Sequence, residues 1–112
     1  MQTKIFYKDK RWKKKRENVL RRDKYQCQEA KRYGQNEEAT TVHHIYPLEE
    51  YPELALADWN LISVSGKRHD TFHDRTTGQV TAAGRYWQKK RQQEFEEWKR
   101  RHPPTQQNYE IY

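Results

Sequence analysis

Four of the five histidines and one asparagine have an order and spacing that could build a metal site with a general base beside it. His43 and His44 are adjacent, fifteen residues separate them from Asn60, eight more precede His69, and three separate His69 from His73. Three neutral imidazoles leave an open position on an ion for water or phosphate, as a catalytic site requires. Imidazoles suit zinc, nickel, copper and iron, whereas magnesium normally prefers more oxygen ligands. The pattern predicts a catalytic metal centre.

The two late histidines are four residues apart on a helix that the sequence predicts from Lys67 to about Arg75. On such a helix both rings emerge from one face and can share an ion. Taken alone, this spacing more often belongs to surface or packing histidines. His43, on a preceding strand, provides the third nitrogen that favours the metal interpretation.

The adjacent pair divides into a ligand and a base. Neighbouring side chains of a strand face opposite ways, so His43 and His44 cannot both bind one ion without distortion. We expect His43 to bind metal and His44 to stay a base, since an imidazole pKa of about 6.5 suits proton transfer from water near neutral pH. Without its context, the pair would be interpreted as surface strand histidines.

The secondary-structure elements that must position these residues can be predicted from the hydrophobic pattern and from the turn and cap residues. We expect a strand over residues 39–45, a long connection over 46–58 with a helical turn at 53–57, and a strand over 61–64. Ser65-Gly66 offers a cap for the helix that carries the late histidines. The sequence around the site therefore predicts strand, long loop, strand and helix.

Two further helices flank this core. Asp9 can cap a helix over residues 10–22, whose apolar stripe consists of Trp12, Val19 and Leu20. An irregular loop is expected over 24–38. A last helix should follow Thr81 over residues 82–101, where Pro103-Pro104 stops it. Its apolar positions Trp87, Phe95 and Trp98 share one face, which we interpret as core and not as a base-stacking platform.

Size and composition bound the fold. The 112 residues, 32% hydrophobic and 35% charged, predict one small α+β domain over 1–102 with a thin core over 39–75, then a flexible tail over 103–112. No apolar run approaches the roughly 20 residues that span a bilayer, and the first residues lack the apolar centre of a secretory signal. With a single cysteine there is no internal disulfide, which fits a cytoplasmic protein.

The net charge of +7 is unevenly placed. Residues 1–24 have a balance of +8, residues 25–66 of −5 and residues 67–101 of +5. Basic clusters suit a phosphate backbone, because each neutralised phosphate releases a condensed counterion. A solvated helix surface is the alternative. If nucleic acid is the partner, we expect phosphate contacts from Lys13, Lys14, Lys15, Lys67 and Arg68.

The stretch from about Arg21 to Arg75, half of the chain, resembles the HNH endonucleases, particularly small phage-encoded ones. The matching segments are DKYQCQ over 23–28, VHHIYPLEEYPELALADWNL over 42–61 and RHDTFHDR over 68–75. The late His-x3-His is also similar to that of the colicin DNases. The resemblance implies the ββα-metal (His-Me finger) fold. It also implies that His43, His69 and His73 bind one divalent ion (Mg, Mn, Zn or Ni), that His44 activates water, and that Asn60 braces the loop or touches the metal.

The function that the resemblance implies is metal-dependent hydrolysis of phosphodiester bonds in double-stranded DNA, as an endodeoxyribonuclease. It further implies a role near phage DNA packaging, with terminase and portal as partners, or nicking of host or competitor DNA in the bacterial cytoplasm. Arg75 could clamp the scissile phosphate or pair with Asp70 or Asp74. The alternatives are a DNA-binding or scaffold module with little cleavage, and a structural metal finger that acts only in protein contacts.

The sequence departs from many HNH relatives in one place. They carry two Cys-x-x-Cys pairs that hold a structural zinc, whereas here only Cys27 remains of the first pair, and Ser65 and Arg68 occupy the second. We therefore expect no structural zinc and an ordinary half-buried thiol at Cys27. Either packing replaces the zinc or the finger is loose; the candidate packing residues are Tyr25, Tyr33, Trp59 and Phe72. His102 is expected on the surface.

Overall fold

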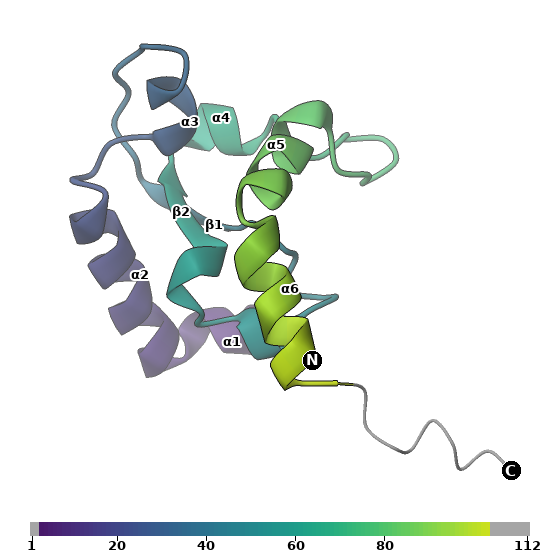
Figure 1. The fold of residues 1–112 in the computed structure, drawn as a ribbon. Helices are drawn as coiled ribbons and strands as arrows, with labels where there is room; N and C mark the ends of the chain where they lie inside the picture. Colours follow the sequence, from purple (N-terminus) through teal and green to yellow (C-terminus); the bar gives the residue numbers. More distant parts are fainter. Residues whose placement is uncertain (1–2, 104–112) are drawn as a thin grey trace, which may run out of the picture.

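The computed structural model describes residues 3–103, with side chains from residue 6 onward (Figure 1). The helices are α1 (Thr3–Lys8), α2 (Lys10–Arg22), α3 (Gln28–Lys31), α4 (Gly66–His69), α5 (Ala82–Lys90) and α6 (Gln92–Arg101), and the strands are β1 (Thr41–His44) and β2 (Leu61–Val64). None of the helices in the described part is long and apolar enough to cross a membrane. The tail predicted over 103–112 lies, beyond its first residue, outside the described residues.

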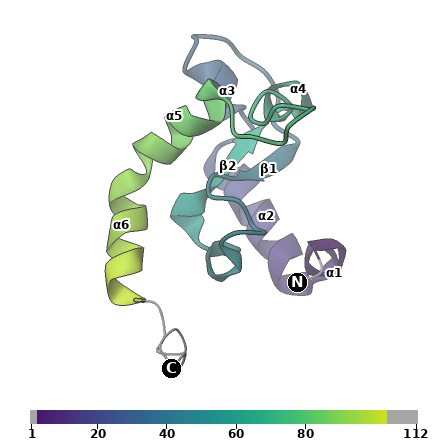
Figure 2. The same ribbon diagram turned by 90° about the vertical axis from the view of Figure 1, so that its right-hand side faces the viewer.

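The centre of the fold is an antiparallel hairpin of β1 and β2, in which His43 pairs with Ile62 and His44 with Leu61. The hairpin lies between α2 on one side and the α5–α6 pair on the other (Figures 1 and 2). Because side chains alternate along a strand, its two faces bury different residues. This small α+β arrangement confirms the predicted fold class.

Each face of the hairpin has its own core. On the α1–α2 face, Val42 and Leu61 pack with the α2 stripe of Trp12, Val19 and Leu20. On the other face, the buried residues include Ile62, Val64, Phe72, Trp87 and Phe95, with Trp98 packed against them. Both predicted apolar stripes are therefore core, as expected from their helical spacing.

Helix α2 covers the residues predicted from its cap and stripe. The Asp9 carboxylate accepts a hydrogen bond from the Arg11 backbone N–H at 2.7 Å, which satisfies a free donor of the first turn. The helix α1 before it was not predicted, because six residues are too few to show a period. Phe6 on α1 packs against Trp12 with ring centres 5.1 Å apart, so tertiary contact stabilises this short helix.

The prediction of a helix over 67–75 is wrong in the length of the helix. Ser65 caps α4 as expected, but the helix ends at His69 and His73 lies beyond it, in a bridge with Val80. Phe72 is fully buried and its backbone C=O accepts from the Thr81 N–H at 3.0 Å. The helix ends early because the Phe72 ring is buried and the backbone around it pairs with the later segment that contains Val80 and Thr81.

Three other predictions of local structure need correction. The helix predicted over 82–101 breaks at Arg91, which has φ −106° and ψ 16° and donates its side-chain Nε–H to the Trp59 C=O at 3.2 Å. The loop over 24–38 contains the one-turn helix α3, capped by the Cys27 thiol. In place of a turn at 53–57 there are two 3-10 turns, Pro52–Leu54 and Asp58–Asn60.

The region of the missing zinc cysteines is held by hydrogen bonds of a buried glutamate, and only partly by the aromatic residues predicted for it. Phe72 is buried and Trp59 packs at the edge of the core, but Tyr25 and Tyr33 are 42% and 55% exposed. Glu29, 2% exposed, instead binds Arg32 at 2.7 Å and accepts from the Trp87 indole N–H at 2.7 Å. Cys27 is fully buried, more so than predicted, and its Sγ accepts from the Ala30 N–H.

Candidate functional site

All four histidines of the sequence pattern line one open cleft of about 590 Å³, called the histidine cleft below. Its walls come from α1, α2, the loop after β1 and the segment after α4. Five consecutive residues, 40–44, line it, so the cleft runs along the edge of β1 that is not paired with β2. The fold thus brings together residues that are up to 66 positions apart, from Tyr7 to His73.

The three predicted ligands form a cluster, with His69 and His73 beside His43. The ring centres of His43 and His69 are 5.1 Å apart, and those of His43 and His73 are 6.3 Å apart. His43 is 4% exposed, and burial together with the neighbouring imidazoles holds its pKa well below the ordinary value. Burial also lowers the pKa of His69. Both rings are therefore neutral near pH 7, which is the form that binds a metal ion.

The donor set suits a divalent ion, but the placement is incomplete. With metal–nitrogen bonds of about 2.1 Å, the ring centres of two ligands on one ion lie roughly 5 Å apart. The His43–His69 pair meets this spacing, whereas His73 is about 1 Å too far from His43. Accordingly, within residues 3–103 no three His, Cys, Asp or Glu side chains are placed to hold an ion together.

His44 faces away from His43, as strand alternation predicts, and its ring is fixed on two sides. Its Nε2 lies 3.1 Å from the Ala55 C=O. A carbonyl only accepts, so Nε2 carries the hydrogen and Nδ1 of the neutral ring holds the lone pair. The Trp12 indole stacks on the ring at 5.0 Å and an angle of 23°. Burial lowers the pKa of His44 below its ordinary value, partly offset by the hydrogen bond to Ala55.

Asn60 lies under the loop that connects the two strands and touches only backbone. Its side-chain oxygen accepts from the Tyr46 N–H at 2.7 Å, and its amide donates to the carbonyls of Tyr46 at 3.1 Å and Leu54 at 3.2 Å. The residue is fully buried and absent from the lining of the cleft. This environment fits a brace for the loop and leaves no direct route to a metal in the cleft.

Three residues of the cleft were missed by the sequence analysis. Arg16 lines the cleft and donates to the Thr40 C=O at 2.6 Å, which fixes its guanidinium and leaves its other N–H donors without a partner among the described residues. Tyr7 and Glu49 line it as well, and burial followed by the charge of Glu49 raises the pKa of the Tyr7 hydroxyl. No local signal identifies them, because α1, α2 and the loop meet only in the folded chain.

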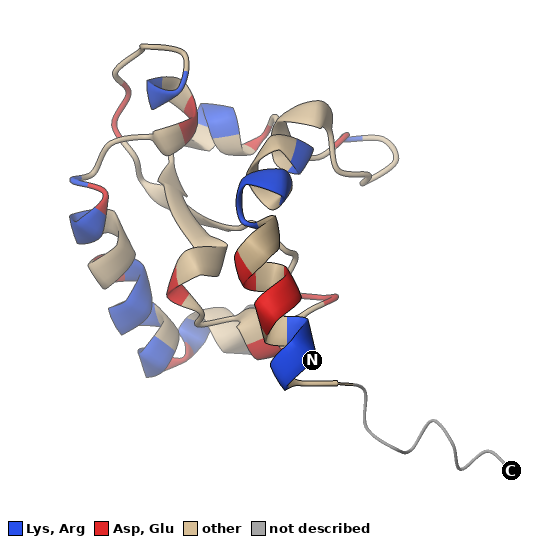
Figure 3. Cartoon of the chain, in the orientation of Figure 1, with Lys and Arg blue, Asp and Glu red and all other residues tan. Residues whose placement is uncertain are grey.

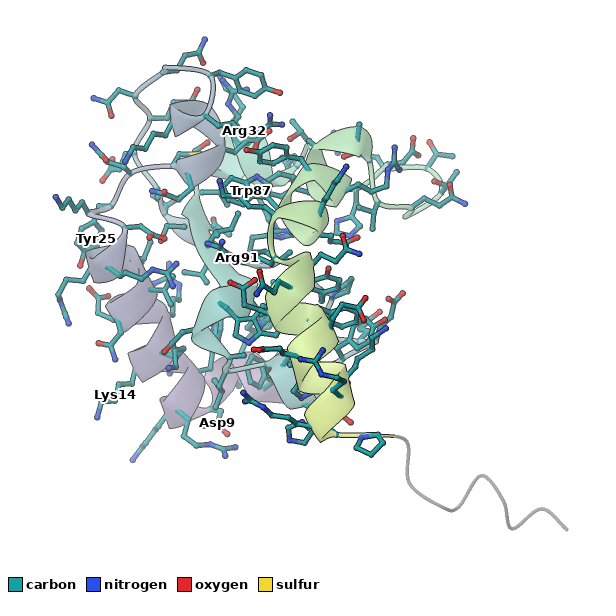
Figure 4. All side chains as sticks on the ribbon, viewed as in Figure 1. Asp9, Lys14, Tyr25, Arg32, Trp87 and Arg91 are labelled. Carbon is teal, nitrogen blue, oxygen red and sulfur yellow. The ribbon has the colours of Figure 1, made fainter. Side chains whose placement is uncertain are left out.

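The residues predicted to contact DNA are spread over several surfaces. Lys13 and Lys14 are exposed on α2, and Lys14 points away from the hairpin (Figure 4). Lys15 instead pairs with Asp58 at 2.6 Å. Arg75 is exposed and lies in a shallow hollow beside His69 and His73, outside the histidine cleft.

The two residues predicted at the start of α4 differ from each other. The Lys67 side chain is 76% exposed and lies 3.6 Å from the Glu37 carboxylate. Arg68 is only 20% exposed, pairs with Glu37 at 3.4 Å and donates to Gln35. The position of the second zinc pair is thus used for an ion pair, and the Arg68 guanidinium faces the protein.

Comparison with known proteins agrees with the fold. The chain is similar to the HNH endonuclease of the deep-sea thermophilic bacteriophage GVE2, whose crystal structure contains a manganese ion. The two are 31% identical, the match covers 61% of this chain and 74% of the phage protein, and the TM-score is 0.59. No protein-family model matches the chain, and no curated protein sequence is significantly similar to it.

Proposed function

Because this chain belongs to the HNH family, we propose that it is a divalent-metal-dependent endonuclease that hydrolyses phosphodiester bonds of double-stranded DNA in the histidine cleft. One observation carries the proposal: four histidines and Arg16 line the same cleft. The likeness to a phage HNH endonuclease supports a nuclease activity. The net charge of +7 supports a polyanionic substrate.

In this proposal the protein groups have separate tasks. His44 takes a proton from the attacking water at Nδ1, because its Nε2–H is engaged by Ala55. Trp12 stacks on the His44 ring and fixes its orientation. Arg16 binds an oxygen of the phosphate. His43, His69 and His73 would hold the divalent ion, which would supply positive charge to stabilise the phosphate during hydrolysis. Manganese, zinc, nickel and magnesium are the candidate ions, and manganese has the support of the phage neighbour.

The experiment is a supercoiled-plasmid assay with each of these ions and with EDTA. His44→Gln keeps an N–H donor for Ala55 but is not a base, so it should lose about 10²–10⁴-fold in cutting rate while metal affinity persists. His102→Ala is the matched control, since His102 is exposed at the end of α6, stacks on Trp98 and does not line the histidine cleft. Cutting at the parental rate by His44→Gln would contradict the role of His44.

A second candidate function is DNA binding without cleavage. The observation that favours it is the burial of His44, which is 7% exposed and surrounded by Phe6, Tyr7 and Trp12. In that case the purified protein should retain plasmid DNA in gel shifts but produce no nicked form with any of the four ions.

We also propose, on the phage source of the neighbour alone, that the chain acts in phage DNA packaging in the cytoplasm of a bacterial host. Terminase and portal would then be its partners. Co-purification of terminase or portal with the tagged protein from phage-producing cells would test this, with the tag alone as control.

A further inference from the structure

A second hollow lies at the opposite edge of the hairpin from the histidine cleft. The histidine cleft runs along β1, whereas this pocket of about 360 Å³ lies beside Ile62 of β2, between the end of α2, α3 and α5. The two share no lining residue. We call it the α3–α5 pocket. Basic segments of α3 and of the α5–α6 junction face this side of the molecule (Figure 3).

The α3–α5 pocket is strongly basic. Among the described residues, five cations and one acid line it; the acid is Asp23, and the cations are Arg22, Lys31, Arg32, Lys90 and Arg91. Figure 4 shows Arg32 and Arg91 above and below Trp87 along this side. The cations come from α2, α3, α5 and the junction after α5, so they surround the opening and suit a ligand with several negative charges.

Two of the five cations are committed to the fold. Arg22 binds Asp23 at 2.9 Å and donates to the Leu61 C=O at 2.7 Å, which fastens α2 to β2. Arg32 binds the buried Glu29 and lies 3.8 Å over the Tyr86 ring. These two residues make the wall of the pocket rigid.

The other three cations are available to a ligand. Lys31, Lys90 and Arg91 make no ion pair with any residue of the described part of the chain. Among the described residues, the Arg91 side chain donates only its Nε–H, to the Trp59 C=O, so the N–H groups of its terminal nitrogens remain available. Lys31 and Lys90 are exposed.

The surroundings favour a nucleic acid over a protein as the ligand. Protein partners normally dock on a buried aromatic or aliphatic anchor. Here Trp87 is 5% exposed, and Tyr86, although 38% exposed, has the Arg32 guanidinium over one face of its ring, so the pocket offers little free aromatic surface as an anchor. Flexible lysines around a rigid wall instead suit phosphates, which they contact without reading sequence.

We propose that the α3–α5 pocket binds the phosphate backbone of a DNA segment separate from the one in the histidine cleft. The two sites lie at opposite edges of the hairpin, so one straight duplex cannot occupy both. The chain then holds two DNA segments at once and can bridge two duplexes. Binding in the α3–α5 pocket does not depend on whether the chain cuts DNA, whereas bridging rests on the proposed binding of DNA in the histidine cleft.

The test compares Lys31→Gln/Lys90→Gln with Lys24→Gln/Lys89→Gln. The second double variant removes the same charge from exposed neighbouring lysines outside the pocket. Duplex affinity is measured at several salt concentrations in EDTA, where no metal-dependent cutting can occur. The slope of log affinity against log salt falls by about 0.9 for each phosphate that the protein no longer neutralises, so the pocket variant should lower it by about 1.8. The control should keep the parental slope.

Bridging is measured separately, as the capture of a free fluorescent duplex by protein bound to a bead-tethered duplex. The parental protein and the control should capture the second duplex, and the pocket variant should not. Equal salt slopes in the two double variants, or equal capture of the second duplex, would overturn the proposal. Plasmid cutting by the same variants reports on the proposed nuclease function independently.

Discussion

Replacing Asn60 by alanine should destabilise the whole domain, because this side chain holds the loop between the strands. It makes three hydrogen bonds to backbone atoms of Tyr46 and Leu54 and is fully buried. Each buried hydrogen bond contributes about 1 kcal/mol net, and the Tyr46 N–H left without an acceptor adds a similar penalty. The expected loss in the free energy of unfolding is about 4 kcal/mol.

Such a loss is large for a domain of this size, whose total stability is of the order of 5–15 kcal/mol. At about 4–8 °C for each kcal/mol, the melting temperature should fall by roughly 16–32 °C. Thermal and urea unfolding followed by circular dichroism would measure it. Asn18→Ala is the matched control, because Asn18 lies on α2 and its side chain bonds only to Arg21 in its own helix; its effect should stay within about 0.5 kcal/mol.

Asn60→Asp separates a brace from a metal ligand. An ionised carboxylate would face the two carbonyls that now accept from the amide, so this variant should be at least as unstable as Asn60→Ala. A carboxylate is a better metal ligand than an amide, so a direct ligand would instead tolerate the change and keep its ion. Melting of Asn60→Ala close to that of Asn18→Ala would refute the brace.

Two further predictions concern charged residues. Lys13→Gln/Lys14→Gln should leave the melting temperature nearly unchanged, because both residues are exposed, but flatten the salt slope of DNA binding by up to about 1.8; an unchanged slope would show that they are only a solvated surface. Glu29→Gln should lower the free energy of unfolding by about 3 kcal/mol in urea titrations, because it leaves Arg32 without its buried counter-charge; a loss below about 0.5 kcal/mol would show that the pair is dispensable.

The sequence predicted those elements whose signals are local. Helix α2 could be predicted because its N-cap and its helical period are both local signals. They are Asp9 and the spacing of Trp12, Val19 and Leu20. The run over 61–64 was enough for β2. Strand alternation also separated His43 from His44, which the structure places on opposite faces of the hairpin.

Long-range contacts decided what the sequence could not predict. α4 ends early because Phe72 is buried and bonded to Thr81, and the last helix breaks where Arg91 reaches Trp59. Lys15 resembles its neighbours in sequence, yet it pairs with Asp58, 43 residues later. Sequence spacing does not reveal such long-range pairings. For this reason the histidines of the cleft could be predicted from their spacing, whereas Arg16 could not.

The position of that arginine leads to the last prediction. From its place near His73, Arg75 was predicted either to clamp the scissile phosphate or to pair with Asp70 or Asp74. It lies outside the histidine cleft, whereas Arg16 lies within it and is fixed by Thr40. A hydrogen bond to a charged group contributes about 1.5–3 kcal/mol. Removing one made to the phosphate in the transition state should therefore slow cutting by roughly 10- to 100-fold.

Arg16→Gln should show this decrease in plasmid cutting, and Arg75→Gln should cut at close to the parental rate. Arg16→Lys keeps the charge but not the planar fork of donors, so it should recover only part of the activity. Both Arg16 variants lack the guanidinium bond to Thr40, and their melting temperatures would reveal any general loosening. If Arg75→Gln cut slowly and Arg16→Gln were fully active, Arg75, in the segment after α4, would be the residue that binds the scissile phosphate. DNA would then approach the histidines from that side.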